Sequence, residues 1–295
     1  DLVRSRGLGD VYKRQNENGM KEYYLAAGLF LCMGMFSCAL KAAEHEKKMD
    51  SSGSATEEAL VVWKDYSMGR ILFNDKAPQS EGSRIYHQLI PDAEAYIRRQ
   101  ACDVLHTLYH GPSDHITPVH HLYYTLKDTD GISAKSGDNG EISIFYSTRH
   151  IEKSFKNNDK SKVYFETRGI LLHELTHAYQ LKPQGIGSYE KNRVFWAFIE
   201  GMADAVRIAN GGFHGEADRP KGGNYMDGYR YAGYFFVWLR DNKDPEFLRK
   251  FNRSTLEVIP WSFDGAIKYV LGEQYDVDKL WNEYQAAVGD KKSCD

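Results

Sequence analysis

Hydrophobic positions along the chain recur at helical spacing in some segments and alternate with polar residues in others. Apolar residues three and four apart predict a buried face on each of three helices: Asp92–Tyr109, about 165–180 and about Val194–Ala209. Short apolar or alternating runs predict strands at Ala59–Trp63, Arg70–Phe73, His120–Leu126 and Glu141–Tyr146. Asn210, Gly211 and Gly212 are residues that end helices, so the third helix should stop there.

The order of these elements predicts the fold class. Strands dominate the first half, and further helices are expected near 229–240, 244–252 and 276–287. Strands followed by helices are typical of an α+β protein, here a mixed sheet with a helix against it and a mainly helical C-terminal half. Large aromatic residues are spread evenly from Trp63 to Tyr284, which favours one domain over residues 59–290.

The first 58 residues lack the pattern of a folded domain. Residues 1–19 have no apolar periodicity, and Asp10–Gln15 resembles a translated sequencing-library adapter, so we expect this segment to be non-native. Residues 20–38 contain the apolar run Tyr23–Phe36, which is too short for a membrane span but suits a signal peptide. Residues 39–58 are polar and are expected to form a flexible tether.

Cys38 follows Ser37 at the end of the apolar run, as in a bacterial lipobox, where the cysteine is lipidated. Ordinary cleavage near Ala39 or Ala43 is the alternative. Either reading predicts export to the cell envelope or the medium, with the membrane contacted only through a lipid on Cys38. Cys102 and Cys294 then remain in the folded part, and the sequence leaves their pairing open.

Composition narrows the function classes. The 295 residues carry 38 basic and 41 acidic side chains, a formal charge of −3. Because the chain has no clustered basic face, nucleic acid is not expected as a partner. We expect a monomer. Two sequence motifs indicate that its substrates are proteins or peptides.

His173-Glu174-Leu175-Thr176-His177 is an HExxH motif inside a mainly apolar helical run. Residues four apart share one face of a helix, so both imidazoles can bind the same Zn²⁺ ion. Glu174 is rotated by about 100° from His173, which lets it accept a proton from water without becoming a ligand. A solvated polar face is the alternative, but the apolar neighbours leave little of this helix for water.

A third ligand is available on the next predicted helix. Glu200 and Asp204 are also four apart. In thermolysin-like zincins a downstream Glu is the third ligand and an Asp one turn later orients a ligand His, and this spacing matches that division. Asp204 as the ligand, an exposed acidic pair, and an Asp204–Arg207 contact are the alternatives. Gly201 is expected to let this helix approach the HExxH helix closely.

The chain resembles the basic secretory protein family of plants and bacteria, metallopeptidases of the zincin superfamily, from about Glu141 to Gly289. The residues that match the family's motifs are His173–His177 with Tyr179-Gln180, then Ile199–Arg207, Leu271-Gly272, and Leu280-Trp281 with Tyr284. The family segment Gly-Tyr-Asp is here Gly228-Tyr229-Arg230, so a role for that acid is not expected. The resemblance implies a zincin-like fold and zinc-dependent peptide bond hydrolysis.

This resemblance implies further roles in catalysis. Zinc would polarise the peptide carbonyl, and Glu174 would act as general base. Tyr229, which aligns with the family motif, is the candidate donor to the oxyanion, although a tyrosine-rich helix can also be plain core packing. The strand Glu141–Tyr146 is expected to edge the cleft and to pair with extended substrate.

Two other function classes stay open. One is a zinc-stabilised surface module that keeps the fold and hydrolyses nothing, against which the presence of Glu174 counts. The other is a non-enzymatic lipoprotein that recognises glycan or protein. His110, His115, His120 and His121 are scattered over loop and strand, and they are interpreted as ordinary histidines rather than as a second metal site.

Overall fold

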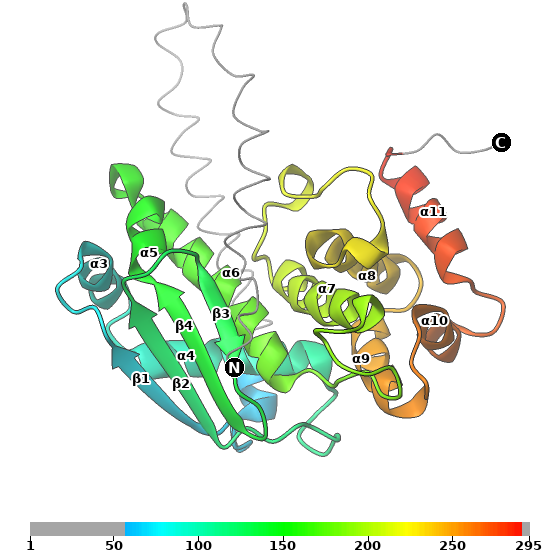
Figure 1. The fold of residues 1–295 in the computed structure, drawn as a ribbon, viewed down its shortest axis with the longest axis horizontal. Helices are drawn as coiled ribbons and strands as arrows, with labels where there is room; N and C mark the ends of the chain where they lie inside the picture. The colour runs from blue at the N-terminus through cyan, green and yellow to red at the C-terminus, as the bar shows by residue number, and fades with distance from the viewer. Residues whose placement is uncertain (1–56, 291–295) are drawn as a thin grey trace, which may run out of the picture.

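The structure is a computed structural model that describes residues 57–290 (Figure 1). The adapter, signal-peptide, lipidation and most of the tether predictions fall on residues outside this range, as does Cys294. No helix within it is long and apolar enough to cross a bilayer. The buried hydrophobic side chains form one cluster that reaches from Ala59 to Tyr284.

The first described segment corrects one prediction. Residues 57–63 form a helix, so the strand predicted at Ala59–Trp63 is wrong. Ala59 and Trp63 are buried while Val61 between them is 69% exposed. Two buried positions four apart are compatible with a helix, and the same apolar run is compatible with a strand. A run this short does not distinguish the two.

A four-stranded mixed sheet forms one side of the molecule (Figure 1). Its order is β1-β2-β4-β3, with bounds Arg70–Asp75, His121–Lys127, Glu141–Ser147 and Ser133–Ser136. β1, β2 and β4 are parallel, and β3 pairs antiparallel with β4. The three longer strands were predicted from their alternation. β3 was not, because Ser-Ala-Lys-Ser has no large apolar residue.

Helices pack on one face of the sheet and then form the C-terminal half (Figure 1). Their bounds are α3 Glu81–Leu89, α4 Ala93–Leu108, α5 Thr148–Ser154, α6 Lys160–Tyr179, α7 Arg193–Ala209, α8 Tyr229–Asn242, α9 Phe247–Glu257, α10 Phe263–Leu271 and α11 Val277–Ala287. Three short 3₁₀ turns lie at Lys156–Asn158, Gly215–Ala217 and Tyr225–Asp227. The α+β arrangement of a mixed sheet before a mainly helical region is confirmed; α3, α5 and α10 were not predicted.

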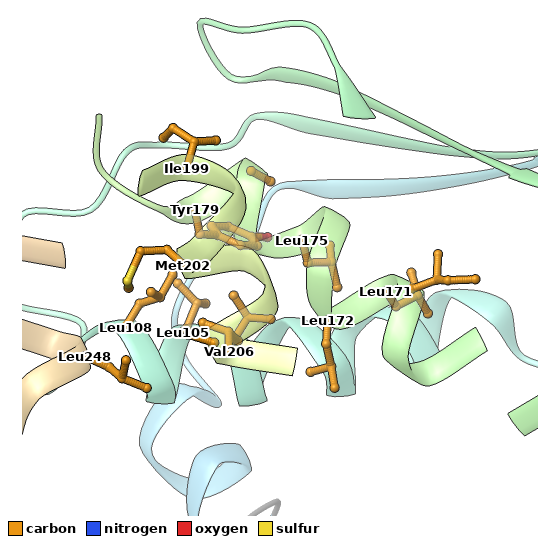
Figure 2. Close-up of a cluster of buried hydrophobic side chains, with 14 of the residues drawn as sticks. Leu105, Leu108, Leu171, Leu172, Leu175, Tyr179, Ile199, Met202, Val206 and Leu248 are labelled. Carbon is orange, nitrogen blue, oxygen red and sulfur yellow. The ribbon is translucent and has the colours of Figure 1, made fainter. Parts of the chain in front are cut away.

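α6 lies between the sheet and the C-terminal helices (Figure 1). Figure 2 shows its leucines, Leu171, Leu172 and Leu175, in one cluster with apolar side chains of α4, α7 and α9. All three leucines are fully buried. From Gly169 to its end at Tyr179, α6 has no exposed residue. Every polar group in this half must therefore find a partner in the protein or in a ligand.

Glycines set how closely the helices approach, but not as predicted. A Cβ on Gly201 would lie 2.5 Å from the Ala232 Cβ, so Gly201 admits α8 and not α6. The close approach of α6 and α7 is at Gly169, where a Cβ would lie 2.6 Å from Nε of Arg207. The expectation for Gly201 failed because sequence spacing does not tell which neighbour a glycine faces.

Candidate active site

The C-terminal half of α6 holds both histidines of the HExxH motif at one place. Their Nε2 atoms lie 3.1 Å apart, and the rings meet edge to face. His173 is 1% exposed and Glu174 is 2% exposed. α6 extends two residues past His177 and ends at Tyr179. The four-residue spacing therefore gives the shared face that the sequence predicted.

α7 brings two carboxylates to these histidines. Glu200 Oε2 lies 3.5 Å from Nε2 of His173 and 3.7 Å from Nε2 of His177. Asp204 Oδ1 lies 2.7 Å from Nδ1 of His173, the opposite side of the same ring. Both carboxylates are buried. The pair is therefore not an exposed acidic face, and Arg207 donates instead to the Gly212 carbonyl.

The three atoms of His173, His177 and Glu200 fit a metal ion in spacing and chemistry. Zinc bonds of about 2.0–2.1 Å in a tetrahedron set the ligand atoms about 3.3 Å apart, which matches the three separations of 3.1, 3.5 and 3.7 Å. Oε1 of Glu174 is buried beside them without a hydrogen-bond partner. An orphaned acceptor of this kind is expected where a ligand or water completes the site.

Electrostatics in this cluster favour a charged ligand carboxylate. Burial alone would raise the pKa of Glu200, but His177 and His173 bring it down to about 2. Burial alone would lower the pKa of His173, but Asp204 and Glu200 raise it to about 10. Burial lowers the pKa of His177 to about 3, which keeps its imidazole neutral. His177 and Glu200 are therefore in the forms that bind metal, whereas the raised pKa means that His173 releases a proton when an ion binds.

The pKa of Glu174 moves the other way from that of Glu200, because here the effect of burial prevails. Burial raises the pKa of this carboxyl to about 7, against the effect of His173 and of the Lys135 backbone N–H. A carboxyl whose pKa lies near neutrality can accept and return a proton at physiological pH. Among the acidic groups of the cluster, Glu174 therefore has the properties of a base rather than those of a ligand.

Two tyrosines reach the cluster from outside α6 and α7. Tyr229, the first residue of α8, stacks its ring on His173 with centroids 6.1 Å apart and has a positive φ of 42°. The Tyr189 hydroxyl, in the loop between α6 and α7, donates to Oε1 of Glu200. Burial, followed by the charge of Glu200, raises the pKa of both phenols. Both therefore stay protonated and can donate.

Gln180 supports the second histidine. Its side-chain Nε2 lies 2.8 Å from Nδ1 of His177, and its Oε1 is buried without a partner. If His177 binds an ion through Nε2, Nδ1 carries the proton and needs an acceptor. Rotation of the Gln180 amide by half a turn would present that acceptor. Gln180 would then support His177 as Asp204 supports His173, in exchange for the hydrogen bond that its Nε2 donates to the Ile199 carbonyl.

The cluster lies in a cleft of about 1130 Å³. Its lining includes β3, the turn after it, and the loop from Leu181 to Glu190. The edge of the sheet at this cleft is β3, because β4 is paired with β2 on one side and with β3 on the other. The prediction that Glu141–Tyr146 edges the cleft is therefore wrong. An unrecognised polar strand occupies that place.

The remaining histidines do not gather. His110 lies 2.8 Å from Glu246, and His121 lies 2.8 Å from Glu141, each at the surface. His115 is at the cleft lining. Within residues 57–290 the His173, His177 and Glu200 group is the one set of three with metal-binding spacing. Cys102 is a buried free thiol.

Sequence reasoning placed five of the groups that meet at the cluster and named Tyr229 beside them. It gave no role to Tyr189 or Lys135, because a loop and a polar strand carry no periodic signal. Gln180 was part of a motif without an assigned task. Its position directly after the HExxH helix, three residues from His177, is a signal from which its contact with that ring could have been inferred.

Comparison with known families agrees with this geometry. A family model described as a peptidase of plants and bacteria, BSP, matches residues 69–284. No curated protein and no solved structure matches the chain. The matched range spans every strand of the sheet, α6, α7 and the cleft between them. The chain therefore belongs to the BSP family, peptidases of plants and bacteria.

Proposed function

We propose that this protein is a zinc-dependent peptidase that hydrolyses peptide bonds, with a zincin-like arrangement of sheet, active-site helix and edge strand. The observation that carries the proposal is the burial of two histidines and a glutamate at tetrahedral spacing beside an orphaned Glu174 oxygen. Buried polar groups without partners are costly, so such a set is retained for a ligand. Membership of a peptidase family supports the reaction class.

His173, His177 and Glu200 would hold the ion, and Asp204 would keep the His173 ring oriented. When bound, zinc supplies a Lewis acid that polarises a peptide carbonyl and acidifies water. Glu174 takes the proton from the attacking water and returns it to the leaving amine. Its pKa of about 7 suits both transfers. The preference for Glu200 over Asp204 as ligand rests on the Nε2 and Nδ1 sides that the two carboxylates face.

Tyr229 and Tyr189 are the candidate donors to the negative oxygen that develops on the carbonyl. Both hydroxyls interact with Glu200, and Tyr229 is favoured because its ring also stacks on His173. The substrate is proposed to lie along β3, whose second edge has no strand partner among residues 57–290. An extended peptide can continue the sheet there by backbone hydrogen bonds.

Export, through the signal peptide and a lipid on Cys38 or by ordinary cleavage, remains part of the proposal, as do the monomeric state and the absence of nucleic acid as a partner. A catalytically silent binding module is the second candidate. A protein of that kind would have no use for a buried Glu174 whose Oε1 has no hydrogen-bond partner, whereas a peptidase uses such an oxygen as its base.

The test is digestion of a peptide library by the full chain, with and without a chelator. We expect cleavage that the chelator abolishes and that zinc restores. The Glu174→Gln variant is the matched control, because it removes the base and leaves the three proposed ligands. Binding of zinc without any cleavage by the unmodified chain would favour the silent module and overturn the proposed reaction.

A further inference from the structure

Two lysines line the cleft from different elements. Lys135 lies in the edge strand β3, and Lys182 follows the end of α6 by three residues. The Lys135 ammonium donates to the Gly137 carbonyl at 2.6 Å. No acidic side chain among residues 57–290 lies within salt-bridge distance of either ammonium group. Both cations therefore face the cleft without a counter-ion in the described part of the chain.

The two lysines share the cleft lining, and the charge of Lys182 acts on Lys135. Burial first, and then the charge of Lys182, lowers the pKa of Lys135 to about 8. Lys135 is half-buried and Lys182 is exposed. A half-buried lysine is normally paired with a carboxylate, because desolvation of an unpaired charge is costly. The desolvation cost at Lys135 and the repulsion between the two lysines both decrease when an anion binds between or beside them. The arrangement is that of an anion subsite rather than of a structural ion pair.

The acidic side chains at the rim of the cleft do not pair with Lys135 or Lys182. Asp138 and Glu190 also line the cleft, and both are exposed at its rim. Asp138 acts on Lys135, and Lys182 acts on Glu190, through charge alone. Neither carboxylate is within 4 Å of a lysine nitrogen. A ligand carboxylate can therefore approach Lys135 without displacing a carboxylate of the protein.

Lys135 is also next to the proposed reaction centre. Its backbone N–H acts on Glu174, and its side-chain charge acts on His177. A group bound to the Lys135 ammonium would therefore lie in the same cleft as the scissile bond, beside the strand that contacts the base Glu174. A carboxylate is the anion that a peptide offers, either on an Asp or Glu side chain or at its C-terminus.

We propose that Lys135 and Lys182 form a carboxylate subsite that selects peptides with an acidic group beside the scissile bond. The inference rests on the proposed peptidase function and adds its substrate class. Two half-exposed charge pairs are expected to favour the acidic peptide over its neutral isostere by about tenfold or more. The preference should decrease at high salt, because the cleft is open to solvent.

The experiment uses the full chain and matched peptides that carry Glu or Gln at each position near the scissile bond. A second arm compares a free C-terminal carboxylate with a C-terminal amide. We expect kcat/KM to be at least about tenfold higher for one Glu peptide than for its Gln counterpart, or for the acid over the amide. The arm that responds identifies the source of the carboxylate.

Three variants and one control test the roles of Lys135 and Lys182. Lys182→Gln, at an exposed site where folding is not at risk, and Lys135→Gln should each move the Glu-to-Gln ratio towards one. Lys135→Glu keeps the backbone N–H and should favour a Lys peptide over a Glu peptide. Lys191→Gln, an exposed lysine outside the cleft lining, removes the same charge nearby and should leave the ratio unchanged.

A binding arm separates this inference from the proposed function. Labelled Glu and Gln peptides are titrated by fluorescence anisotropy into the full chain carrying Glu174→Gln. Tighter binding of the acidic peptide, lost in the Lys135→Gln and Lys182→Gln backgrounds, supports the subsite even if no peptide is cleaved. The subsite is overturned if the unmodified chain cleaves or binds the Glu and Gln peptides equally well. It is also overturned if both lysine variants leave the Glu-to-Gln ratio unchanged. Either result leaves the peptidase proposal intact.

Discussion

At the floor of the cleft the polar groups lie on two buried helices, whereas at the rim they lie on an edge strand and a loop. The floor groups, from α6 and α7, are at most 4% exposed apart from His177. Apart from the buried Ser133, the polar rim groups on β3 and on the loop from Leu181 to Glu190 are half-buried or exposed. The apolar cluster in Figure 2 packs α6 against α7 and fixes the floor.

This difference separates two tasks. Burying ionisable groups costs several kcal/mol each unless they are paired, so the floor is not built for stability, and its groups hold fixed positions that chemistry requires. The rim can change its side chains at little cost to the fold, which suits selection among substrates. Variants at the floor should therefore change metal binding and turnover, and variants at the rim should change preference.

The largest effect is expected at the floor carboxylates. Glu200→Gln replaces a charged ligand by a neutral amide and should abolish stoichiometric metal. Asp204→Asn keeps an acceptor near Nδ1 of His173 and should weaken metal binding by about 10- to 100-fold. Competition with a chelator measures both affinities. If Asp204→Asn loses the metal and Glu200→Gln keeps it, the two roles are reversed.

Glu174→Gln separates catalysis from metal binding. Its carboxyl has no ligand role in the account, so metal content should stay near that of the unmodified chain. The rate of peptide hydrolysis should fall by at least about 100-fold, the usual scale for loss of a general base. Metal analysis and single-turnover kinetics on the same sample give both values. An unchanged rate would refute the assigned base.

The two tyrosines should differ in which parameter they change. Tyr229→Phe removes the proposed oxyanion donor and should lower kcat by about 100-fold with little change in metal affinity. Tyr189→Phe removes a donor to Glu200 and should act mainly on metal affinity. Steady-state kinetics at saturating zinc separates them. A larger fall in kcat for Tyr189→Phe would transfer the donor role to the loop.

A smaller effect is expected at Gln180. Gln180→Leu leaves the Nδ1 proton of a metal-bound His177 without an acceptor and should weaken metal binding by about tenfold. Gln180→Glu keeps an acceptor and should bind more tightly than the leucine variant. Equal losses in both variants, measured by chelator competition, would show that Gln180 only fills space.

The sequence predicted the parts of the fold and site that follow a period. Residues four apart share a helix face whatever surrounds the helix, because helix geometry is local. The sequence therefore predicted the pairs His173 with His177 and Glu200 with Asp204. The partner of each face is not local. Gly201 contacts α8 rather than α6, and an edge strand without apolar residues replaces β4 at the cleft. Lys135 and Tyr189 could not be placed for the same reason.

The most direct test of the central claim is the metal content of the full chain and of two variants, His173→Ala and His177→Ala. Each protein is purified, equilibrated with zinc, and freed of unbound ion before elemental analysis. The account predicts one zinc per chain in the unmodified protein and none in either variant, with all three still folded by circular dichroism. Retention of one zinc per chain by both variants would contradict the account.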